Sequence, residues 1–278
     1  MDTQTKKELQ IFATKVRMGV IDGTFCAKAG HPGGSLSVAD ILTYLYFEKM
    51  NIDPKNPKKP DRDRFVLSKG HAAPLLYSVL ANRGFFDVES LTTLRQIGSI
   101  LQGHPDMKHI PGVDMSSGSL GQGISCAVGM ALSAKHFGDN YKVYALLGDG
   151  ELEEGQVWEA AMFAANKNLS NLTIFVDYNN LQIDGTIDEV NSPYPIDKKF
   201  EAFNWHVITI DGHDFNQIEK AVADAENINK PVCIVAKTTK GKGVSFMENS
   251  CDWHGKAPND EQYEVAMSDL KKIFEELN

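Results

Sequence analysis

The amino-acid sequence predicts an α/β fold in which a mainly parallel sheet carries helices on both faces. Apolar, β-rich runs of strand length alternate along the chain with segments whose apolar residues recur at helical spacing. Two of these strand-like runs end in glycine or asparagine sequences of the kind found at the edge of such a sheet. No internal repeat, low-complexity tract or linker divides the chain, so residues 1–278 are expected to form one domain that ends in a helix.

The first part of the chain is expected to be mainly helical. Apolar residues at helical spacing predict a helix over Thr5–Lys28, and Val38–Phe47 has the composition of a buried helix. The polar, proline-rich segment 51–63 predicts a surface connection. A short strand, Phe65–Leu67, then leads through the sequence SKGH into a helix that continues to Leu80.

The second part of the chain carries the βαβ rhythm. The segment Ile124–Phe137 is rich in Ala, Gly and Ser, which suits a closely packed helix. The apolar spacing over residues 260–275 predicts a final amphipathic helix. The expected strands are Val143–Leu147, Thr173–Val176, His206–Ile210 and Val232–Ala236.

Composition argues against one class of function. A net charge of −9 argues against a nucleic-acid-binding surface, which needs a basic face. It does not exclude a phosphorylated ligand, because a local site can oppose the global charge. At 278 residues and 42% hydrophobic content, the chain can bury a substantial core.

The ends and the cysteines indicate a cytoplasmic protein without a membrane partner. The start, MDTQTKKELQ, lacks the apolar core of a signal peptide, and no apolar run approaches the length of a membrane span. The four cysteines (Cys26, Cys126, Cys233 and Cys251) form no Cys-x-x-Cys pair, so reduced thiols are expected. Cys251 and His254 have a Cys-x-x-His spacing, but without further ligands a zinc site is not expected.

The most informative pattern joins two strand ends. One apolar strand runs into Gly-Asp-Gly, and after a predicted helix the next strand ends in Asn-Asn. Ligands of such sheets bind beyond the carboxyl ends of the strands, where the N–H of Gly150 is placed to favour phosphate. The carboxylate of Asp149, an amide oxygen of Asn179 or Asn180 and a main-chain carbonyl form an oxygen-only set. That set suits Mg²⁺ or Ca²⁺ bridging a diphosphate.

The glycine and acidic motifs also have simpler interpretations. A Gly-Asp-Gly sequence alone is usually a turn. Glu151 and Glu153 are interpreted as acidic residues that favour a helix N-terminus. The sequences GSLGQG and GDGELEEG do not fit GxGxxG, and TKGKGVS lacks the spacing of a P-loop, so nicotinamide and nucleoside-triphosphate sites lose support.

The spacing from Gly-Asp-Gly to Asn-Asn resembles the thiamine diphosphate motif, and further segments make the resemblance specific. In the order and approximate spacing of transketolases the chain carries GHPGGSLS (30–37), LSKGHAAPLLY (67–77), QGHPD (102–106), SSGSLGQGIS (116–125), KTTKGKG (237–243) and DWHGKAP (252–258). From about His31 to His254 it is similar to the N-terminal, diphosphate-binding part of transketolase. Ser119 stands where the family usually has proline, which bears on the rigidity of a loop expected to make backbone contacts.

The resemblance implies which residues hold thiamine diphosphate and its metal. Asp149, Asn179 and the carbonyl of Leu181 match the ligands of Mg²⁺, with Ca²⁺ as the alternative. Gly150 matches the residue whose N–H meets the diphosphate. The other implied cofactor contacts are Gly118 and Leu120 at the aminopyrimidine, Leu181 and Ile183 at the thiazolium, and His71 and His254 at the diphosphate and the reacting carbons.

Histidines are the implied catalytic residues. His31 and His104 match histidines of the sugar channel, and together with His71 and His254 they are expected to move protons on sugar hydroxyls, a task that suits the ordinary pKa of histidine. The remaining four, His109, His136, His206 and His213, are interpreted as surface or structural residues, with a helix-capping turn as the alternative for His213.

The implied function is that of a transketolase, which transfers a two-carbon ketol unit from a ketose phosphate to an aldose phosphate, as in the pentose phosphate pathway. Full transketolases resemble a chain more than twice as long, and only 24 residues follow His254. We therefore expect one subunit of a split transketolase, active only with a C-terminal partner subunit that supplies the glutamate activating the cofactor. Glu154 matches a glutamate near the interface between two active sites, so homodimerisation within a heterotetramer is expected.

Two other thiamine enzymes stay open as alternatives: a split enzyme acting on another ketose, and the α-type subunit of a 2-oxoacid dehydrogenase. The latter shares the Gly-Asp-Gly…Asn pattern but is not expected to carry the contexts of all four histidines. A catalytically idle binding or regulatory subunit is a further alternative, against which the intact motif positions argue.

Overall fold

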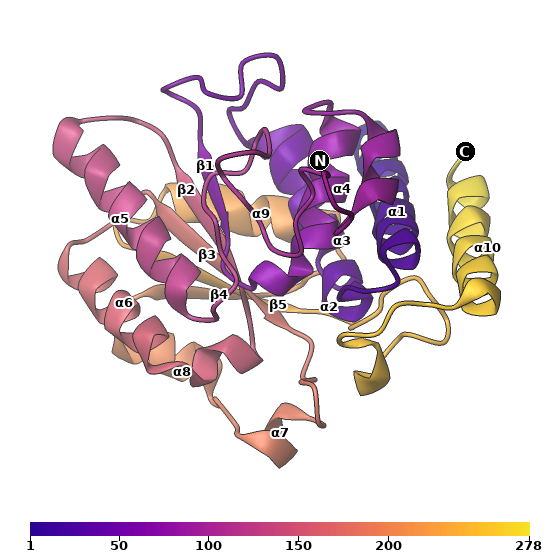
Figure 1. The fold of residues 1–278 in the computed structure, drawn as a ribbon. Helices are drawn as coiled ribbons and strands as arrows, with labels where there is room; N and C mark the ends of the chain where they lie inside the picture. The colour runs from indigo at the N-terminus through magenta and orange to yellow at the C-terminus, as the bar shows by residue number, and fades with distance from the viewer.

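The computed structural model describes all 278 residues and contains one five-stranded sheet of order β1-β2-β3-β5-β4 (Figure 1). Every pair of neighbouring strands runs parallel, which confirms the predicted sheet. The strands are β1 (Arg64–Leu67), β2 (Val143–Gly148), β3 (Leu172–Tyr178), β4 (His206–Asp211) and β5 (Val232–Lys237).

Helices cover both faces of the sheet. One layer contains α1 (Thr3–Ala27), α2 (Pro32–Leu36), α3 (Ala39–Tyr44), α4 (Ala73–Arg83), α9 (Phe215–Glu226) and α10 (Asp260–Leu277). The other contains α5 (Gln122–Phe137), α6 (Gly155–Asn166) and α8 (Ile196–Ala202), and the short α7 (Ile187–Val190) lies apart in the connection after β3 (Figure 1). A π-helix, η1 (Leu45–Lys49), continues α3, and four 3₁₀ segments complete the set: η2 (Gly70–Ala72), η3 (Val88–Thr93), η4 (Gly150–Glu153) and η5 (Cys251–Trp253).

The strands bury both of their faces, as a parallel sheet between two helical layers requires. Along β2, Tyr144 and Leu146 belong to the core under α1, α3 and α4, whereas Ala145 and Leu147 belong to the core under α5 and α6. This alternation explains why the strands appear in the sequence as nearly continuous apolar runs.

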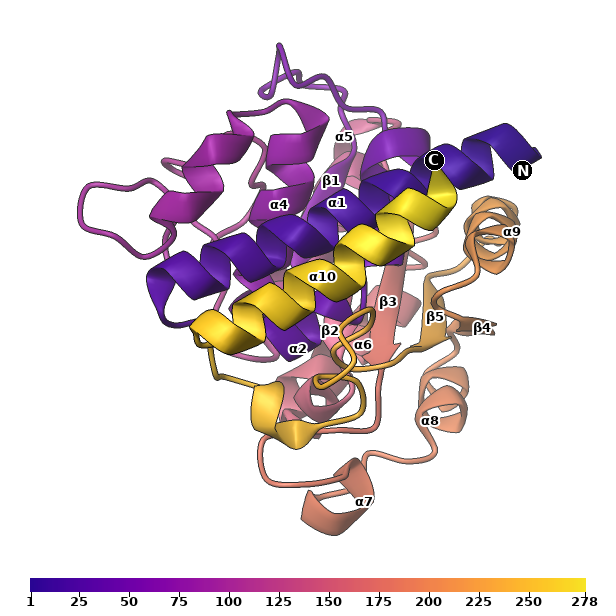
Figure 2. The ribbon, with the colours of Figure 1, turned by 90° about the vertical axis from the view of Figure 1, so that its right-hand side faces the viewer.

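The C-terminal helix returns to the start of the chain, where α10 lies along α1 (Figure 2). The side chain of Asn259 caps α10 together with Gln262 in a capping box. The hydroxyl of Tyr263 donates to Asp22 at 2.8 Å, and its ring stacks on Phe25. These contacts attach α10 to the helical layer that supports the site.

All five strands point the same way, so the segments after their carboxyl ends lie at one edge of the sheet. The sequence Ser-Lys-Gly-His follows β1, Asp149 follows β2 and Asn179 follows β3. Residues 238–240 follow β5. These four segments of the sequence motifs thus meet at this edge.

Candidate active site

A cavity of about 270 Å³ opens at the carboxyl edge of the sheet. It is lined by segments that follow β1, β2, β3 and β5, by the start of α2 and by the loop that precedes α5. Of the residues expected to bind or react, it brings together His31, His71, Gly118, Leu120, Asp149, Gly150, Asn179, Leu181, Ile183 and His254. His104 and Glu154 do not line this cavity.

Asp149 is a buried carboxylate held by backbone amides. Its two oxygens accept hydrogen bonds from the N–H groups of Gly150 at 2.9 Å and Asn180 at 2.6 Å. Only 3% of the residue is exposed. Burial, together with the negative charge of Asp177, raises the pKa of Asp149 to about 7. A divalent cation beside Asp149 would stabilise its ionised form.

The sequence predicts that the N–H of Gly150 is placed to meet a phosphate, but in the structure this N–H already has a partner. It donates to the adjacent carboxylate of Asp149, because Asp149 caps the 3₁₀ turn η4. A Cβ atom at position 150 would lie 3.2 Å from the side chain of Gln182, so glycine keeps this approach open.

The oxygen donors of the expected metal site belong to Asp149, Asn179 and Leu181. The amide oxygen of Asn179 accepts from the N–H of Leu181 at 3.1 Å, which fixes the turn after β3. One carboxylate, one amide oxygen and one main-chain carbonyl are hard donors that fit Mg²⁺ or Ca²⁺. The chain contains no cluster of three or more His, Cys, Asp or Glu side chains suited to a metal.

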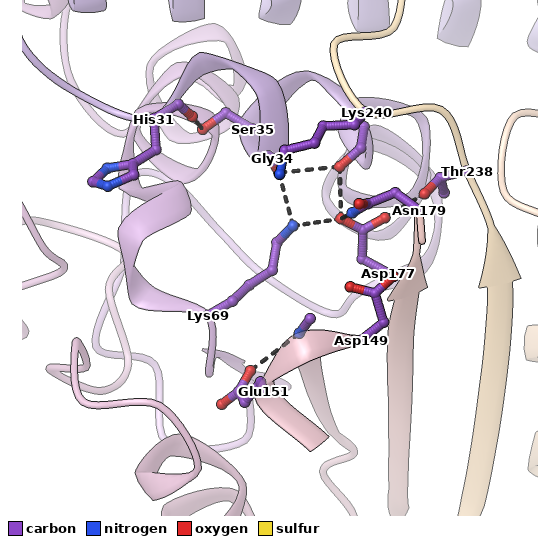
Figure 3. Close-up of polar contacts among 12 residues, drawn as sticks. His31, Gly34, Ser35, Lys69, Asp149, Glu151, Asp177, Asn179, Thr238 and Lys240 are labelled. Atoms are coloured by element: carbon purple, nitrogen blue, oxygen red, sulfur yellow. Dashed lines mark hydrogen bonds and ion pairs between the residues drawn. The ribbon is translucent and has the colours of Figure 1, made fainter. Parts of the chain in front are cut away.

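Two buried lysines that sequence reasoning did not select add positive charge to the cavity. The ammonium of Lys69 donates to Asp177 at 2.5 Å and to the carbonyl of Gly34 at 2.7 Å, and Figure 3 shows its side chain pointing at both. Although burial opposes ionisation, the charge of Lys69 and the hydrogen bonds from Ser37 and Thr238 hold the pKa of Asp177 below its usual value. The carboxylate therefore stays charged beneath the cavity.

Lys240, the second of these lysines, is 1% exposed. Its ammonium lies 3.2 Å from the carbonyl oxygen of Leu181, 3.3 Å from that of Gln182 and 3.0 Å from Nδ1 of His254. Burial and the nearby charge of Lys69 lower the pKa of Lys240 to about 8. Both lysines lie in motifs that indicated the site, SKGH and KTTKGKG. Their place inside these motifs is the sequence feature by which they could have been selected.

Three histidines form one cluster at the cavity. The ring centroids of His31, His71 and His254 lie 5.2 to 5.6 Å apart. Burial and neighbouring positive groups lower the pKa of His31 to about 4 and that of His254 to about 3, and they lower the pKa of His71 well below its usual value. All three imidazoles are therefore neutral near pH 7, each with one N–H donor and one lone pair. The Nδ1 atom of His31 is buried without a partner.

Comparison with known proteins agrees with this geometry. The family described as transketolase, thiamine diphosphate binding domain, matches residues 9–273. The chain belongs to this family.

Relatives support the assignment over whole chains. The 6-deoxy-6-sulfo-D-fructose transketolase subunit SqwG of Clostridium sp. strain MSTE9 is 46% identical over 266 residues, which cover 95% of this chain and 97% of that protein. An apulose-4-phosphate transketolase subunit of Phocaeicola vulgatus is 42% identical, with 97% and 96% covered. The crystal structure of transketolase from Campylobacter jejuni has a TM-score of 0.90 at 37% identity, and the match covers 98% of this chain but 43% of that one.

Two residues selected through the transketolase resemblance lie outside the cavity. His104 is exposed, and its ring packs near Gly118, where an added Cβ would meet it at 3.3 Å. Glu154 is exposed at the start of α6, and its Cβ would lie 2.9 Å from a Cβ added at Gly121. His104 thus lies next to a residue of the cavity wall, and Glu154 lies on an outer surface.

Glu151 is not the simple helix-terminal acid that the sequence indicated. It is 2% exposed and accepts hydrogen bonds from the Ser68 hydroxyl at 2.5 Å and the N–H groups of Gly121 at 2.8 Å and Gly148 at 3.1 Å. Burial raises the pKa of Glu151, and these donors oppose the rise. The residue joins three walls of the cavity, which meet only in the folded chain.

The remaining histidines lie away from the cavity. His109 is exposed and pairs with Asp106 at 2.5 Å. His213 is partly buried and bonded on both ring nitrogens, as a structural histidine should be. All four cysteines are free, and no helix of this chain is both long and apolar enough to cross a membrane.

Proposed function

We propose that this chain is the diphosphate-binding subunit of a split, thiamine diphosphate-dependent transketolase. The proposed reaction transfers a two-carbon ketol unit from a ketose phosphate to an aldose phosphate. The observation that carries the proposal is the arrangement of oxygen donors, buried lysines and neutral histidines around one cavity. In addition, relatives of the same length as this chain carry names that describe transketolase subunits.

The donor set at the floor of the cavity supports a metal–diphosphate. In the proposal Asp149, Asn179 and the carbonyl of Leu181 hold Mg²⁺, with Ca²⁺ as the alternative. Lys69 and Lys240 supply positive charge that complements a diphosphate in a protein of net charge −9. Lys240 contacts the same carbonyl of Leu181 that the metal would use, and the two lone pairs of that oxygen can serve both partners.

The remaining cofactor contacts are proposed from the lining of the cavity. Gly150 is assigned to the diphosphate because its missing Cβ keeps the approach open. Gly118 and Leu120 are assigned to the aminopyrimidine, and Ile183, with Leu181, to the thiazolium. When bound, thiamine diphosphate supplies a nucleophilic carbon and an electron sink for breaking a C–C bond beside a carbonyl.

The histidines are assigned the proton transfers. Burial lowers the pKa values of His31, His71 and His254, so each is neutral near pH 7 and offers a sugar hydroxyl one lone pair and one N–H for hydrogen bonds, whereas the ordinary pKa expected for proton transfer is not kept. The unpartnered Nδ1 of His31 leaves one such group free for a ligand. His104, outside the cavity but beside Gly118, is assigned to the channel through which the sugar enters.

The assembly is part of the proposal. Residues 1–278 are proposed as one domain that pairs with a second copy near Glu154 and with two C-terminal subunits in a heterotetramer. Relatives of similar length that are named as transketolase subunits support a separate partner. A cytoplasmic location and a role in the pentose phosphate pathway are proposed with it, and the four free thiols suit a reducing compartment.

Mixing the purified chain with a candidate C-terminal subunit tests the function. With thiamine diphosphate and Mg²⁺ present, ketol transfer should appear in the mixture, be absent from each component on its own and saturate at a one-to-one ratio. Because one relative is named for a sulfonated ketose and another for a ketose phosphate, the assay includes both kinds of donor. Robust transfer by this chain alone, shown by mass spectrometry to be free of any partner, would overturn the split-enzyme proposal.

A further inference from the structure

A chain of polar contacts connects the N-terminal helix with the loop that bears Lys240. The guanidinium of Arg17 on α1 donates to both carboxylate oxygens of Asp40 on α3, at 3.0 and 2.6 Å. The same carboxylate lies 2.8 Å from Nδ1 of His213, in the turn between β4 and α9. Nε2 of His213 lies 2.9 Å from the backbone nitrogen of Thr239, directly before Lys240.

The tautomer of His213 follows from its partners. A backbone N–H can only donate, so Nε2 of His213 accepts from Thr239 and carries no proton. Nδ1 then carries the proton and donates it to Asp40, which Arg17 orients from the other side. Asp40 therefore fixes the tautomer in which His213 can hold the amide of Thr239.

The residues around Thr239 have separate anchors. Thr238 donates through its hydroxyl to Asp177, and the N–H of Gly241 donates to the carbonyl of Gly33 at 3.0 Å. The side chain of His213 is the sole hydrogen-bond partner of the N–H of Thr239. Because the next side chain along the chain is that of Lys240, the contact with His213 sets the direction in which this buried lysine leaves the backbone.

We infer that His213 is a positioning residue that, held by Asp40 and Arg17, places Lys240 for cofactor binding. The inference rests on the proposed function, in which Lys240 faces the diphosphate. His213 is absent from the lining of the cavity, so it acts through the backbone of Thr239 and not by touching the ligand. A buried ion pair such as Arg17–Asp40 is weak evidence for stability, and a positioning role gives a reason for its geometry.

Two substitutions separate the two hydrogen bonds of His213. The amide nitrogen of asparagine can take the place of Nδ1, so His213→Asn keeps the bond to Asp40 and loses the acceptor for Thr239. The longer glutamine places its amide oxygen near the position of Nε2, so His213→Gln keeps that acceptor. The exposed His136 on α5 provides the matched control, His136→Asn.

Hydrogen exchange followed by mass spectrometry on the unliganded full chain is the first measurement. In His213→Asn, a peptide containing Thr239 and Lys240 should exchange about tenfold faster, because one hydrogen bond of ordinary net strength is lost. Peptides from β2 and β3 should be unchanged. His213→Gln and His136→Asn should stay within about threefold of the wild type.

Titration with thiamine diphosphate and Mg²⁺, in the presence of the partner subunit, is the second measurement. His213→Asn should weaken cofactor binding about tenfold while lowering the melting temperature by no more than about 4 °C, and His213→Gln should restore most of the affinity. Faster exchange throughout the sheet with a lower melting temperature would show a general structural role and overturn the inference. Exchange and affinity equal to those of His136→Asn would overturn it as well. If the wild type binds no cofactor even with its partner, the proposed function fails, and the exchange result still decides whether His213 holds Thr239.

Discussion

The ammonium of Lys69 lies 2.5 Å from a carboxylate oxygen of Asp177 directly beneath the cavity, at side-chain exposures of 2% and 0%. Asp177 also accepts hydrogen bonds from Ser37, Asn179 and Thr238. These partners lie in the turn between α2 and α3 and just after β1, β3 and β5. One carboxylate therefore connects most of the segments that build the site (Figure 3).

Replacing Asp177 should therefore cost stability as well as function. Asp177→Asn keeps the shape of the side chain but leaves the buried charge of Lys69 without its partner, which typically costs about 3 kcal/mol or more. The free energy of unfolding, measured with urea, checks this. Asp224→Asn removes an exposed pairing with Lys220 and should cost less than about 1 kcal/mol. Equal effects of the two substitutions would contradict a strong role for the buried pair.

Asp149 should matter for the cofactor far more than for the fold. Asp149→Ala removes one proposed metal ligand together with a buried carboxylate whose pKa is raised to about 7 by burial and by Asp177. Loss of a residue that only supports a metal ligand typically weakens metal binding about 10- to 100-fold, so loss of the ligand itself should exceed that. Calorimetry of Mg²⁺-dependent thiamine diphosphate binding in the assembled enzyme checks the expectation.

The control for that experiment is Asp188→Ala, which changes an exposed carboxylate on α7. It should leave cofactor binding unchanged. An Asp149→Ala enzyme with the affinity of the control would remove Asp149 from the metal site.

Much of the fold could be predicted because its signals are local. The apolar strands, the Gly-Asp-Gly turn and the capped C-terminal helix each depend on neighbouring residues. The helix expected over Val38–Phe47 differs in detail, since α3 passes into a π-helix at Leu45. Such a widened turn leaves little trace in the apolar spacing.

The site could be predicted less completely because its support is non-local. The oxygen of Glu151 that bonds Gly121 and Ser68 contacts residues 30 and 83 positions away, so neighbouring residues alone favoured a helix-terminal role. Asp177 did leave a signal, a carboxylate inside the apolar run TIFVDY, where burial demands a partner. Its partner Lys69 lies 108 positions away, and only the fold identifies it.

Acid should weaken the Arg17–Asp40 contact in a defined window. Burial opposes ionisation of Asp40, but Arg17 and the hydrogen bond from His213 outweigh it and lower the pKa to about 2, from 3.8. A carboxylate whose pKa is lower in the folded state stabilises the fold above its unfolded pKa and loses this effect as the pH falls through its folded pKa. The contribution, about 2 kcal/mol, should be complete above about pH 4 and mostly lost near pH 2.

Asp40→Asn isolates this contribution. The difference in unfolding free energy between wild type and variant should be largest above about pH 4 and should shrink by about 2 kcal/mol toward pH 2. Denaturant titrations at several pH values measure it. A difference that stays constant across this window would mean that Asp40 has the same pKa in the folded and unfolded chains.

His104 should separate sugar binding from cofactor binding. It lies outside the cavity that brings together the proposed diphosphate and metal ligands, and it is exposed beside Gly118. In the assembled enzyme, His104→Ala should raise the KM for the donor ketose about tenfold or more, while the affinity for thiamine diphosphate changes less than about twofold. His109→Ala, which alters an exposed histidine five residues further on, should change neither.

His254→Ala provides the opposite case, because His254 lines the cavity and lies 3.0 Å from the ammonium of Lys240, so its loss should weaken cofactor binding too. Steady-state kinetics and a cofactor titration on the same preparations measure both effects, and equal losses of sugar and cofactor binding in His104→Ala would assign His104 to the diphosphate site or to a structural role.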